Sequence, residues 1–260
     1  MSANVKAHRK TKKYGPITIL PCVPSLDGEP WDYPIKRPFV LVNMAMTADG
    51  KIATANREVS SFGSPKDQTH LYELRATADA VMCGARTLDA NAVHLGPGAP
   101  RFRKQRLKRG LDEYNLRVVV TGSGSIRPDA AIFSKHFSPI IVLTTASAGL
   151  TRIHRLQELA DEVVICGQRE LDFQLAVTHL YTRWGVRRLL CEGGGDLNDA
   201  LFRAGLVKEL HLTVCPYVFG GRTAPTIAGG KGFEHLAQAT KMRLKTLRHH
   251  KDEVFLVFRS

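Results

Sequence analysis

Residues 189–202, LLCEGGGDLNDALF, place one acid and three consecutive glycines where an apolar run gives way to an amphipathic one. Glycine lets a backbone approach a ligand closely, and the first turn of a helix offers unpaired N–H groups that favour phosphate. The run therefore predicts an anion-binding turn at Gly193, Gly194 and Gly195, with a tight turn that binds nothing as the alternative. It matches the dinucleotide-binding fingerprint poorly, because Asn198 stands where the last glycine belongs.

Three other stretches carry candidate chemistry. The turn VTGSGS at 120–125 also follows a strand-like run, and it gains weight if both glycine-rich turns lie at one sheet edge. AMTADGKIA at 45–53 contains Asp49 and Lys51, which form either a solvated Asp-Gly turn or an acid and an amine beside a ligand. Arg75 ends a helix-like segment, where it either complements the helix dipole or binds phosphate with two hydrogen bonds.

Several other chemistries lack their motifs. The sequence has no H-x-E with P-C-x-x-C, no G-x-S-x-G, no H-E-x-x-H and no P-loop, which argues against the corresponding deaminase, hydrolase, protease and nucleotidase sites. The five cysteines form no C-x-x-C pair and four lie in apolar runs, so we expect reduced thiols, no metal site and a cytoplasmic location. No apolar run approaches the roughly 18 residues of a membrane span, and no apolar segment follows the basic N-terminus as in a secretory signal.

The net charge of +13 reflects 37 Lys and Arg against 24 Asp and Glu. Eleven of the bases lie in two runs without acids, 1–13 and 101–109, and the other 26 nearly balance the 24 acids. A nucleic-acid-binding face would spread its charge and interleave aromatic rings, whereas only Phe102 interrupts the second run. We interpret the runs as a solvated tail and a solvated loop, with contact to a polyanion or a phosphorylated small molecule as the alternative.

The elements that must position these residues follow one pattern. Strand-length apolar runs alternate with amphipathic segments, which predicts an α/β fold with helices on both faces of a mostly parallel sheet, in three layers. The strand-like segments at 207–221 and 242–259 have no obvious helix between them, so we expect antiparallel C-terminal strands. The Gly-, Pro- and Arg-rich stretch 91–115 is predicted to be the longest irregular segment, a place where long loops are often functional.

The chain divides into a basic, proline-rich N-terminal extension, 1–37, and one domain, 38–260. In order, NMAMTADGKIA, SSFGSPKD, LRATADAVMCGARTL, LRVVV and CEGGGDLNDALFRAGLVKELHLTVCPYVFGG resemble the reductase domain of riboflavin biosynthesis over 38–259. The resemblance implies a dihydrofolate-reductase-like fold and a homodimer. It also implies NADPH-dependent reduction of the ribosyl group of a diaminopyrimidinone or amino-uracil ribosylamino 5′-phosphate to ribityl. Because no deaminase part is visible, we expect a stand-alone reductase.

The same resemblance assigns roles to residues. Lys51 and Asp49 lie near the substrate, Ser60 or Ser61 with Arg75 holds the ribose phosphate, and Glu192 faces the aminopyrimidine. An ionised carboxylate such as Glu192 suits amino-group donors, because it only accepts hydrogen bonds. The implied cofactor contacts are Ala45, Thr87, Asn91, Gly122, Ser123, Gly193, Gly194, Gly195, Asp196, Leu197 and Asn198.

Three questions stay open at this level. Hydride arrival at carbon leaves a nitrogen that needs a proton, for which Asp49, Lys51 and a bound water are alternatives. Arg86, Arg127 or a base in 101–109 would select NADPH over NADH by meeting the 2′-phosphate. The apolar segment EVFLVFR would be a hazard as an uncovered sheet edge, which favours a homodimer.

Two alternative functions follow, one from departures from the family's sequence pattern and one from the two basic runs. Asn91 stands where the family often has an acid, and the loop after it is long, so another pterin-like or heterocyclic substrate of the same fold and cofactor is the near alternative. The alternative from a different class is a polyanion- or nucleic-acid-binding protein on an inactive reductase fold, supported by the two basic runs alone.

Overall fold

The computed structural model describes residues 15–20, 36–57, 62–90 and 92–260. Its strands are β1 (Ile17–Ile19), β2 (Phe39–Thr47), β3 (Ala80–Gly84), β4 (Leu116–Val120), β5 (Ile140–Thr144), β6 (Glu162–Ile165), β7 (Arg188–Cys191), β8 (Val207–Cys215), β9 (Arg243–His250) and β10 (Glu253–Arg259). Its α-helices are α1 (Pro65–Arg75), α2 (Ala85–Ala90), α3 (Pro100–Lys108), α4 (Leu150–Leu159), α5 (Phe173–Trp184) and α6 (Gly195–Arg203).

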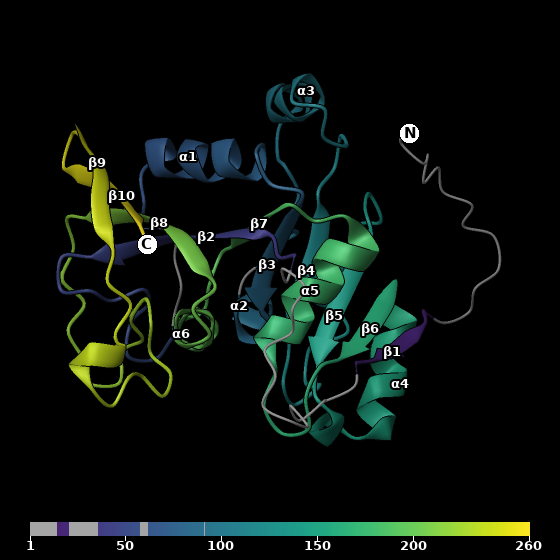
Figure 1. Ribbon diagram of the computed structural model, residues 1–260. Helices are drawn as coiled ribbons and strands as arrows, with labels where there is room; N and C mark the ends of the chain where they lie inside the picture. Colours follow the sequence, from purple (N-terminus) through teal and green to yellow (C-terminus); the bar gives the residue numbers. More distant parts are fainter. Residues whose placement is uncertain (1–14, 21–35, 58–61, 91) are drawn as a thin grey trace.

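The strands form one sheet in the order β1-β6-β5-β4-β3-β7-β2-β8-β10-β9 (Figure 1). Strands β1 to β8 run parallel to one another, and β10 runs antiparallel to both β8 and β9. Burial of the central strands on both faces explains the near-continuous apolar runs of the sequence. Completely buried residues in the middle of the sheet include Leu41, Val81, Val119 and Leu190. The predicted sheet, with antiparallel C-terminal strands, is confirmed.

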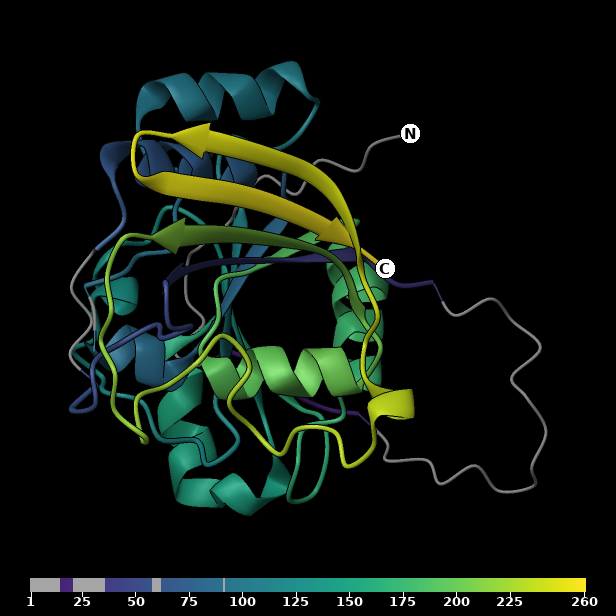
Figure 2. The same ribbon diagram turned by 90° about the vertical axis from the view of Figure 1, so that its left-hand side faces the viewer.

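Helices cover both faces of the sheet, so the three predicted layers are present (Figures 1 and 2). On one face α5 and α6 bury Val177, Leu180 and Leu201 against the strands. On the other face Leu74 of α1 and Ile153 of α4 belong to a second apolar cluster, together with residues of α2. Burying both faces is what excludes water from a parallel sheet.

Local signals fix the ends of two helices. Ser64 caps α1 by accepting hydrogen bonds from the N–H groups of Lys66 and Asp67, and Pro65 occupies the first helical position. Gly185 ends α5 in the left-handed conformation at φ 68°, which a residue with a side chain adopts at a cost.

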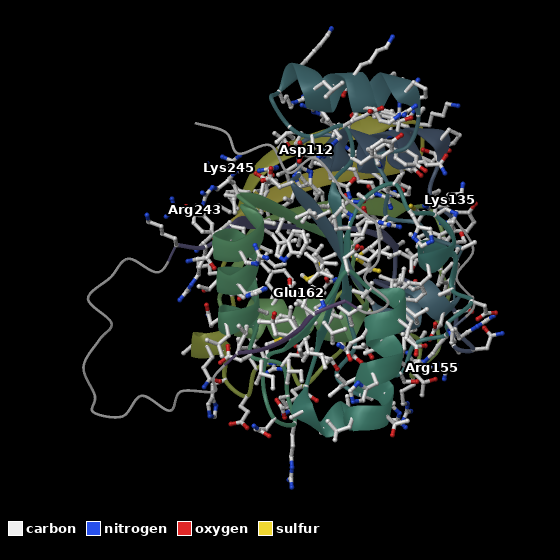
Figure 3. All side chains as sticks on the ribbon, turned by 90° about the vertical axis from the view of Figure 1, so that its right-hand side faces the viewer. Asp112, Lys135, Arg155, Glu162, Arg243 and Lys245 are labelled. Atoms are coloured by element: carbon white, nitrogen blue, oxygen red, sulfur yellow. The ribbon has the colours of Figure 1, made fainter. Side chains whose placement is uncertain are left out.

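Part of the predicted N-terminal extension belongs to the sheet. Residues of β1 pair with β6, and Thr18 donates to the buried Glu162 carboxylate at 2.5 Å. Glu162 also accepts from Trp184 Nε1 at 2.5 Å and faces His179 Nε2 at 3.1 Å (Figure 3). Burial by itself raises the pKa of Glu162, but these hydrogen bonds lower it to about 2. The predicted basic tail, 1–13, lies outside the described residues.

The second basic run is a helix and not a solvated loop. Within the stretch predicted to be irregular, α3 stacks Phe102 on Tyr72 with ring centroids 5.4 Å apart. Arg106 is buried and donates to the carbonyl oxygens of Arg75 at 2.7 Å and Ala78 at 2.5 Å. It thereby caps the C-terminal end of α1, where a cation is favourable. Hydrophobic periodicity did not predict this helix, because the buried Arg106 occupies a position where an amphipathic helix normally has an apolar residue.

The C-terminal edge of the sheet is also different from the prediction. EVFLVFR forms β10, which lies between β8 and β9 and is not an edge. The edge strand is β9, exposed along its length and rich in bases, with Arg243 and Lys245 labelled in Figure 3. Charged side chains discourage edge-to-edge pairing, so the argument for a homodimer from an uncovered apolar edge does not hold.

The four described cysteines, Cys83, Cys166, Cys191 and Cys215, are buried and free, which agrees with the predicted reduced thiols. Burial raises the pKa of Cys166, Cys191 and Cys215 to about 12, so these thiols are unreactive at neutral pH. Among the described residues no helix is both long and apolar enough to cross a membrane. The same part of the chain contains no group of three side chains suited to hold a metal ion.

Candidate active site

A cleft of about 1430 Å³ opens at the carboxyl ends of the parallel strands. Its lining comes from the segments that follow β2, β3, β4, β6, β7 and β8. This is the edge where open α/β sheets bind their ligands. Pockets for one ligand measure roughly 300–1,000 Å³, so the cleft has room for a cofactor and a substrate side by side.

Both glycine-rich turns open into this cleft. Gly122 and Ser123 line it after β4, and Gly194 and Gly195 line it after β7. The condition under which the second turn gains weight, a shared sheet edge, is therefore met. The helix that begins at Gly195 has its first backbone N–H groups without partners inside the helix. A phosphate group fits such a turn by charge and by donor chemistry.

The three adjacent glycines are needed for different reasons. Gly193 has φ 79°, and a Cβ there would lie 2.5 Å from Met44 Sδ. A Cβ on Gly195 would lie 2.5 Å from the carbonyl oxygen of Thr226. At Gly194 the nearest atom to a Cβ is Thr87 Oγ1, at 3.4 Å. Packing thus demands Gly193 and Gly195, whereas Gly194 keeps the space beside the cleft open.

The remaining predicted cofactor residues divide into two groups. Ala45, Thr87, Asp196 and Leu197 line the cleft. Asn198 does not line it, because its buried side chain donates from Nδ2 to Ile227 O at 2.7 Å and so fastens α6 to the segment after β8. The structure thus shows a structural role for the Asn198 side chain, and its predicted cofactor contact stays a prediction. Gly193 does not line the cleft either, and Asn91 lies outside the described residues.

Arg86 contacts the first turn of α6. Its guanidinium pairs with the carboxylate of Asp196, and both side chains are largely exposed. Thr87, the next residue, lies with its Oγ1 3.4 Å from the backbone nitrogen of Gly194. The start of α2 and the start of α6 therefore face each other across the middle of the cleft.

Arg75 and Glu192 form one buried ion pair. Arg75 donates from Nε and Nη2 to the two Glu192 oxygens at 2.5 and 2.6 Å, and from Nη1 to Gly96 O at 2.7 Å. The two side chains are only 7% and 9% exposed. Burial lowers the pKa of Arg75, but the charge and hydrogen bonds of Glu192 outweigh it, and the net direction is upward.

Only the acid of this pair reaches the cleft. Glu192 lines it, as predicted, and Arg75 does not. These three hydrogen bonds use three of the five N–H groups of the guanidinium, so one N–H on each of Nη1 and Nη2 is left for a further acceptor. The structure shows Arg75 holding Glu192, and its predicted phosphate contact stays a prediction. Ser60 and Ser61, the other predicted phosphate ligands, lie outside the described residues.

Asp49 and Lys51, predicted together, have separate roles. The Asp49 carboxylate accepts hydrogen bonds from Thr47 Oγ1 at 2.5 Å, Gly220 N at 2.7 Å and Phe219 N at 3.2 Å. These bonds, that from Thr47 above all, lower the pKa of Asp49. Asp49 does not line the cleft, and a carboxyl with a lowered pKa is a poor proton donor, so these contacts do not favour its predicted catalytic role, which stays a prediction. Lys51 does line the cleft.

Among the cleft-lining residues that sequence reasoning missed are Asp67, Arg57 and Arg222. Asp67 sits in the first turn of α1, where an acid is ordinary, so its type gave no signal. Burial raises the pKa of Asp67, and the nearby charge of Glu253 adds to the shift although a hydrogen bond with Thr213 opposes it. Arg57 and Arg222 lie in turns, where exposed bases are common.

A doubly covered parallel sheet whose carboxyl edge joins glycine-rich turns to a buried carboxylate defines a nucleotide-cofactor-binding α/β domain. The chain belongs to the family described as the RibD C-terminal domain, whose model matches residues 38–256. Its fold is the dihydrofolate-reductase-like fold predicted from sequence, and solved chains share it.

Named relatives and structures agree with this family. The 2,5-diamino-6-ribosylamino-4(3H)-pyrimidinone 5′-phosphate reductase of Methanothermobacter thermautotrophicus is 34% identical, over 80% of this chain and 92% of that protein. RibD of Acinetobacter baumannii superposes with a TM-score of 0.67 at 20% identity, over 86% of this chain but only 58% of that chain. A pyrimidine reductase-like protein of Corynebacterium diphtheriae gives a TM-score of 0.66 at 21% identity, over 86% and 92%.

Proposed function

We propose that this chain reduces the ribosyl group of 2,5-diamino-6-ribosylamino-4(3H)-pyrimidinone 5′-phosphate to ribityl, with NADPH as the reductant. The observation that carries the proposal is the juxtaposition, in one cleft, of the Gly194–Gly195 helix start and the Glu192 carboxylate. The name of the archaeal relative supports the substrate. The 5-amino-6-ribosylamino-uracil 5′-phosphate is the alternative within the same family.

The cofactor side of the cleft fits a dinucleotide. Gly194, Gly195 and Asp196 present the first N–H groups of α6, to which we assign the pyrophosphate, with Gly122 and Ser123 alongside. Arg86 lies at the exposed mouth beside Asp196, where its guanidinium suits the 2′-phosphate that distinguishes NADPH from NADH. Ala45 lines the floor near Glu192, the place we assign to the nicotinamide. When bound, NADPH supplies a hydride to the sugar carbon.

On the substrate side, Glu192 accepts hydrogen bonds from the amino groups of the pyrimidine. Its carboxylate stays oriented because Arg75 donates to both oxygens from behind. The acceptor carbon reacts as the open-chain imine, so reduction leaves a nitrogen that takes up one proton. Asp67 lines the cleft and keeps its proton to higher pH than a free carboxyl, which favours it over Asp49 as the donor. Lys51 stays a substrate contact.

The assembly and location are part of the same proposal. A second hollow of about 650 Å³ lies between α1 and the strands β8, β9 and β10, and β9 exposes Leu244 and Leu247. We propose that a second copy of this chain covers this region, giving a homodimer. Sedimentation that yields only the monomer mass would contradict it. Buried free thiols favour a reducing compartment such as the cytoplasm.

The decisive test is a turnover assay that follows NADPH oxidation with the ribosylamino-pyrimidinone phosphate and with its uracil counterpart. We expect turnover with the former, and thermal stabilisation by NADPH alone, since a ligand that binds only the native state stabilises it. Turnover with neither compound, together with no effect of NADPH on thermal unfolding, would refute the proposal. Retention of nucleic acid that is lost steeply with salt would instead favour the polyanion-binding alternative.

A further inference from the structure

A second buried acid, Glu253, lies behind the cleft at the start of β10. It is only 5% exposed and does not line the cleft. Its Oε1 accepts a hydrogen bond from Ser64 N at 2.6 Å, and its Oε2 accepts one from Ser64 Oγ at 2.5 Å. Cys215 Sγ, at the end of β8, donates to Oε1 at 3.7 Å. Glu253 therefore fastens the residue before α1 to two strands of the sheet.

Ser64 passes this attachment on to Asp67. The same Oγ that donates to Glu253 accepts from the backbone N–H groups of Lys66 and Asp67, at 3.1 and 3.3 Å. The first turn of α1 is thus capped by a serine that Glu253 holds in place, beside the start of β10 (Figure 1). A Cβ on Gly63 would collide with the Asp67 carboxyl, so the glycine leaves that group its space. Both Gly63 and Asp67 line the cleft.

The charged groups around Asp67 come from four elements. Strand β10 contributes Glu253, and the strand pairing places His250 of β9 opposite it. Strand β8 contributes Cys215, whose thiol is neutral because its pKa is raised to about 12. Helix α1 itself contributes Lys66, the exposed neighbour of Asp67. Of these groups, Glu253 is the one whose charge shifts the pKa of Asp67.

These surroundings favour the protonated form of Asp67. Burial is the largest cause that raises the pKa of Asp67, and the charge of Glu253 adds to it against a hydrogen bond with Thr213. A like charge disfavours ionisation, because two neighbouring carboxylates repel each other. A general acid must keep its proton at the working pH and lie within reach of the atom that takes it. Glu253 serves both requirements without reaching the substrate.

We infer that Glu253 is a positioning residue for the reduction: through Ser64 it fixes the first turn of α1, and it sets a like charge behind the Asp67 carboxyl. The inference rests on the proposed function, in which Asp67 is the proton donor. Once hydride has reached the sugar carbon, the electron pair of the former C=N bond remains on nitrogen. The Asp67 O–H bond then breaks as an N–H bond forms, and solvent returns a proton to the Asp67 carboxylate.

Two variants separate the charge of Glu253 from the helix cap. Glu253→Gln keeps the cap, because the amide oxygen can accept from Ser64 N while the amide nitrogen donates to Ser64 Oγ. It removes the like charge, so the decline of kcat with rising pH should begin at a lower pH than in wild type. At the acid end of the profile kcat should be unchanged, and so should the KM for substrate and for NADPH.

Ser64→Ala does the reverse, since it keeps the charge of Glu253 and removes the cap. It should lower kcat and reduce the unfolding temperature by about 2–4 °C, the size of one lost helix cap, without moving the pH at which kcat declines. Glu162→Gln is the matched control, because it removes a buried, hydrogen-bonded carboxyl on β6, far from β10 in the strand order (Figure 3). This control should leave the pH of the decline where it is in wild type.

An NMR titration of the Asp67 carboxyl carbon, assigned with Asp67→Asn, gives a readout that does not depend on turnover. The pKa of Asp67 should be lower in Glu253→Gln than in wild type. An equal pKa in the two proteins, a decline of kcat that begins at the same pH, or wild-type kcat in Ser64→Ala would each overturn the inference. Failure of the reductase function alone would abolish turnover in wild type and leave the difference between the two titrations intact.

Discussion

Replacing Arg75 with methionine removes the cation that holds Glu192 and leaves a carboxylate that is only 9% exposed without a partner. Breaking a buried ion pair from one side costs about 3–5 kcal/mol, because the remaining charge stays desolvated. In a chain of 260 residues each kcal/mol lowers the unfolding temperature by roughly 2–4 °C. We therefore expect Arg75→Met to lower it by roughly 6–20 °C.

The assay is thermal unfolding of four proteins: wild type, Arg75→Met, Glu192→Gln and the double variant. Because the double variant has no unpaired buried charge, it should be more stable than the sum of the single changes predicts, as a double-mutant cycle measures. The KM for substrate should rise in Arg75→Met, since Glu192 loses its orientation, and it should rise equally for phosphorylated and dephosphorylated substrate. An unchanged unfolding temperature with a KM effect confined to the phosphorylated substrate would refute the reasoning and restore Arg75 as the phosphate ligand.

Three further outcomes follow from the site. Gly194→Val fills the space beside Thr87 and should weaken NADPH binding in a thermal-shift titration. Glu192→Gln should instead raise the KM for substrate more than the KM for NADPH. The opposite pattern would contradict the assignment of the glycines to the cofactor and of Glu192 to the substrate. Asp67→Asn should lower kcat by roughly 10²–10⁴-fold and remove the decline of rate with rising pH, the direction expected when a donor with a raised pKa loses its proton; an unchanged pH profile would exclude Asp67 as the donor. Glu162 has its pKa lowered from 4.5 to about 2, so its contribution of about 3 kcal/mol is present above pH 4.5 and disappears as the pH falls towards 2. Denaturant titrations of Glu162→Gln should lack that pH dependence, and an identical dependence in both proteins would contradict it.

The sequence alone predicted the three layers of the fold and the edge of the sheet at which ligands bind. Near-continuous apolar runs specify strands buried on both faces, and Gly185 and Pro65 mark helix ends, because these signals are local and repeat along the chain. The same local chemistry placed the two glycine-rich turns after strands. Parallel strands bring their carboxyl ends to one edge, so the sequence could state a shared edge for both turns as a condition, and the structure meets that condition.

The tertiary structure decided which charged groups meet. Arg75 and Glu192 are 117 positions apart, and nothing local distinguishes a guanidinium that binds phosphate from one that holds a carboxylate. In the sequence Arg106 belongs to a run of bases that is typical of a solvated segment. Only the packing of α3 shows that its side chain is bound at the C-terminal end of α1. Side-chain partners of this kind depend on how helices and loops pack on the sheet.

The three glycines and the preceding acid show both what the sequence determined and what only the tertiary structure decided. Their composition determined that the backbone turns sharply at a helix start and comes close to other atoms, since only glycine tolerates the conformation of Gly193. Only the fold decided that Gly193 meets Met44, that Gly195 meets Thr226, and that Gly194 alone keeps space beside the cleft. Glu192 stands beside the proposed anion-binding turn without conflict because Arg75, brought in from α1, neutralises it from behind.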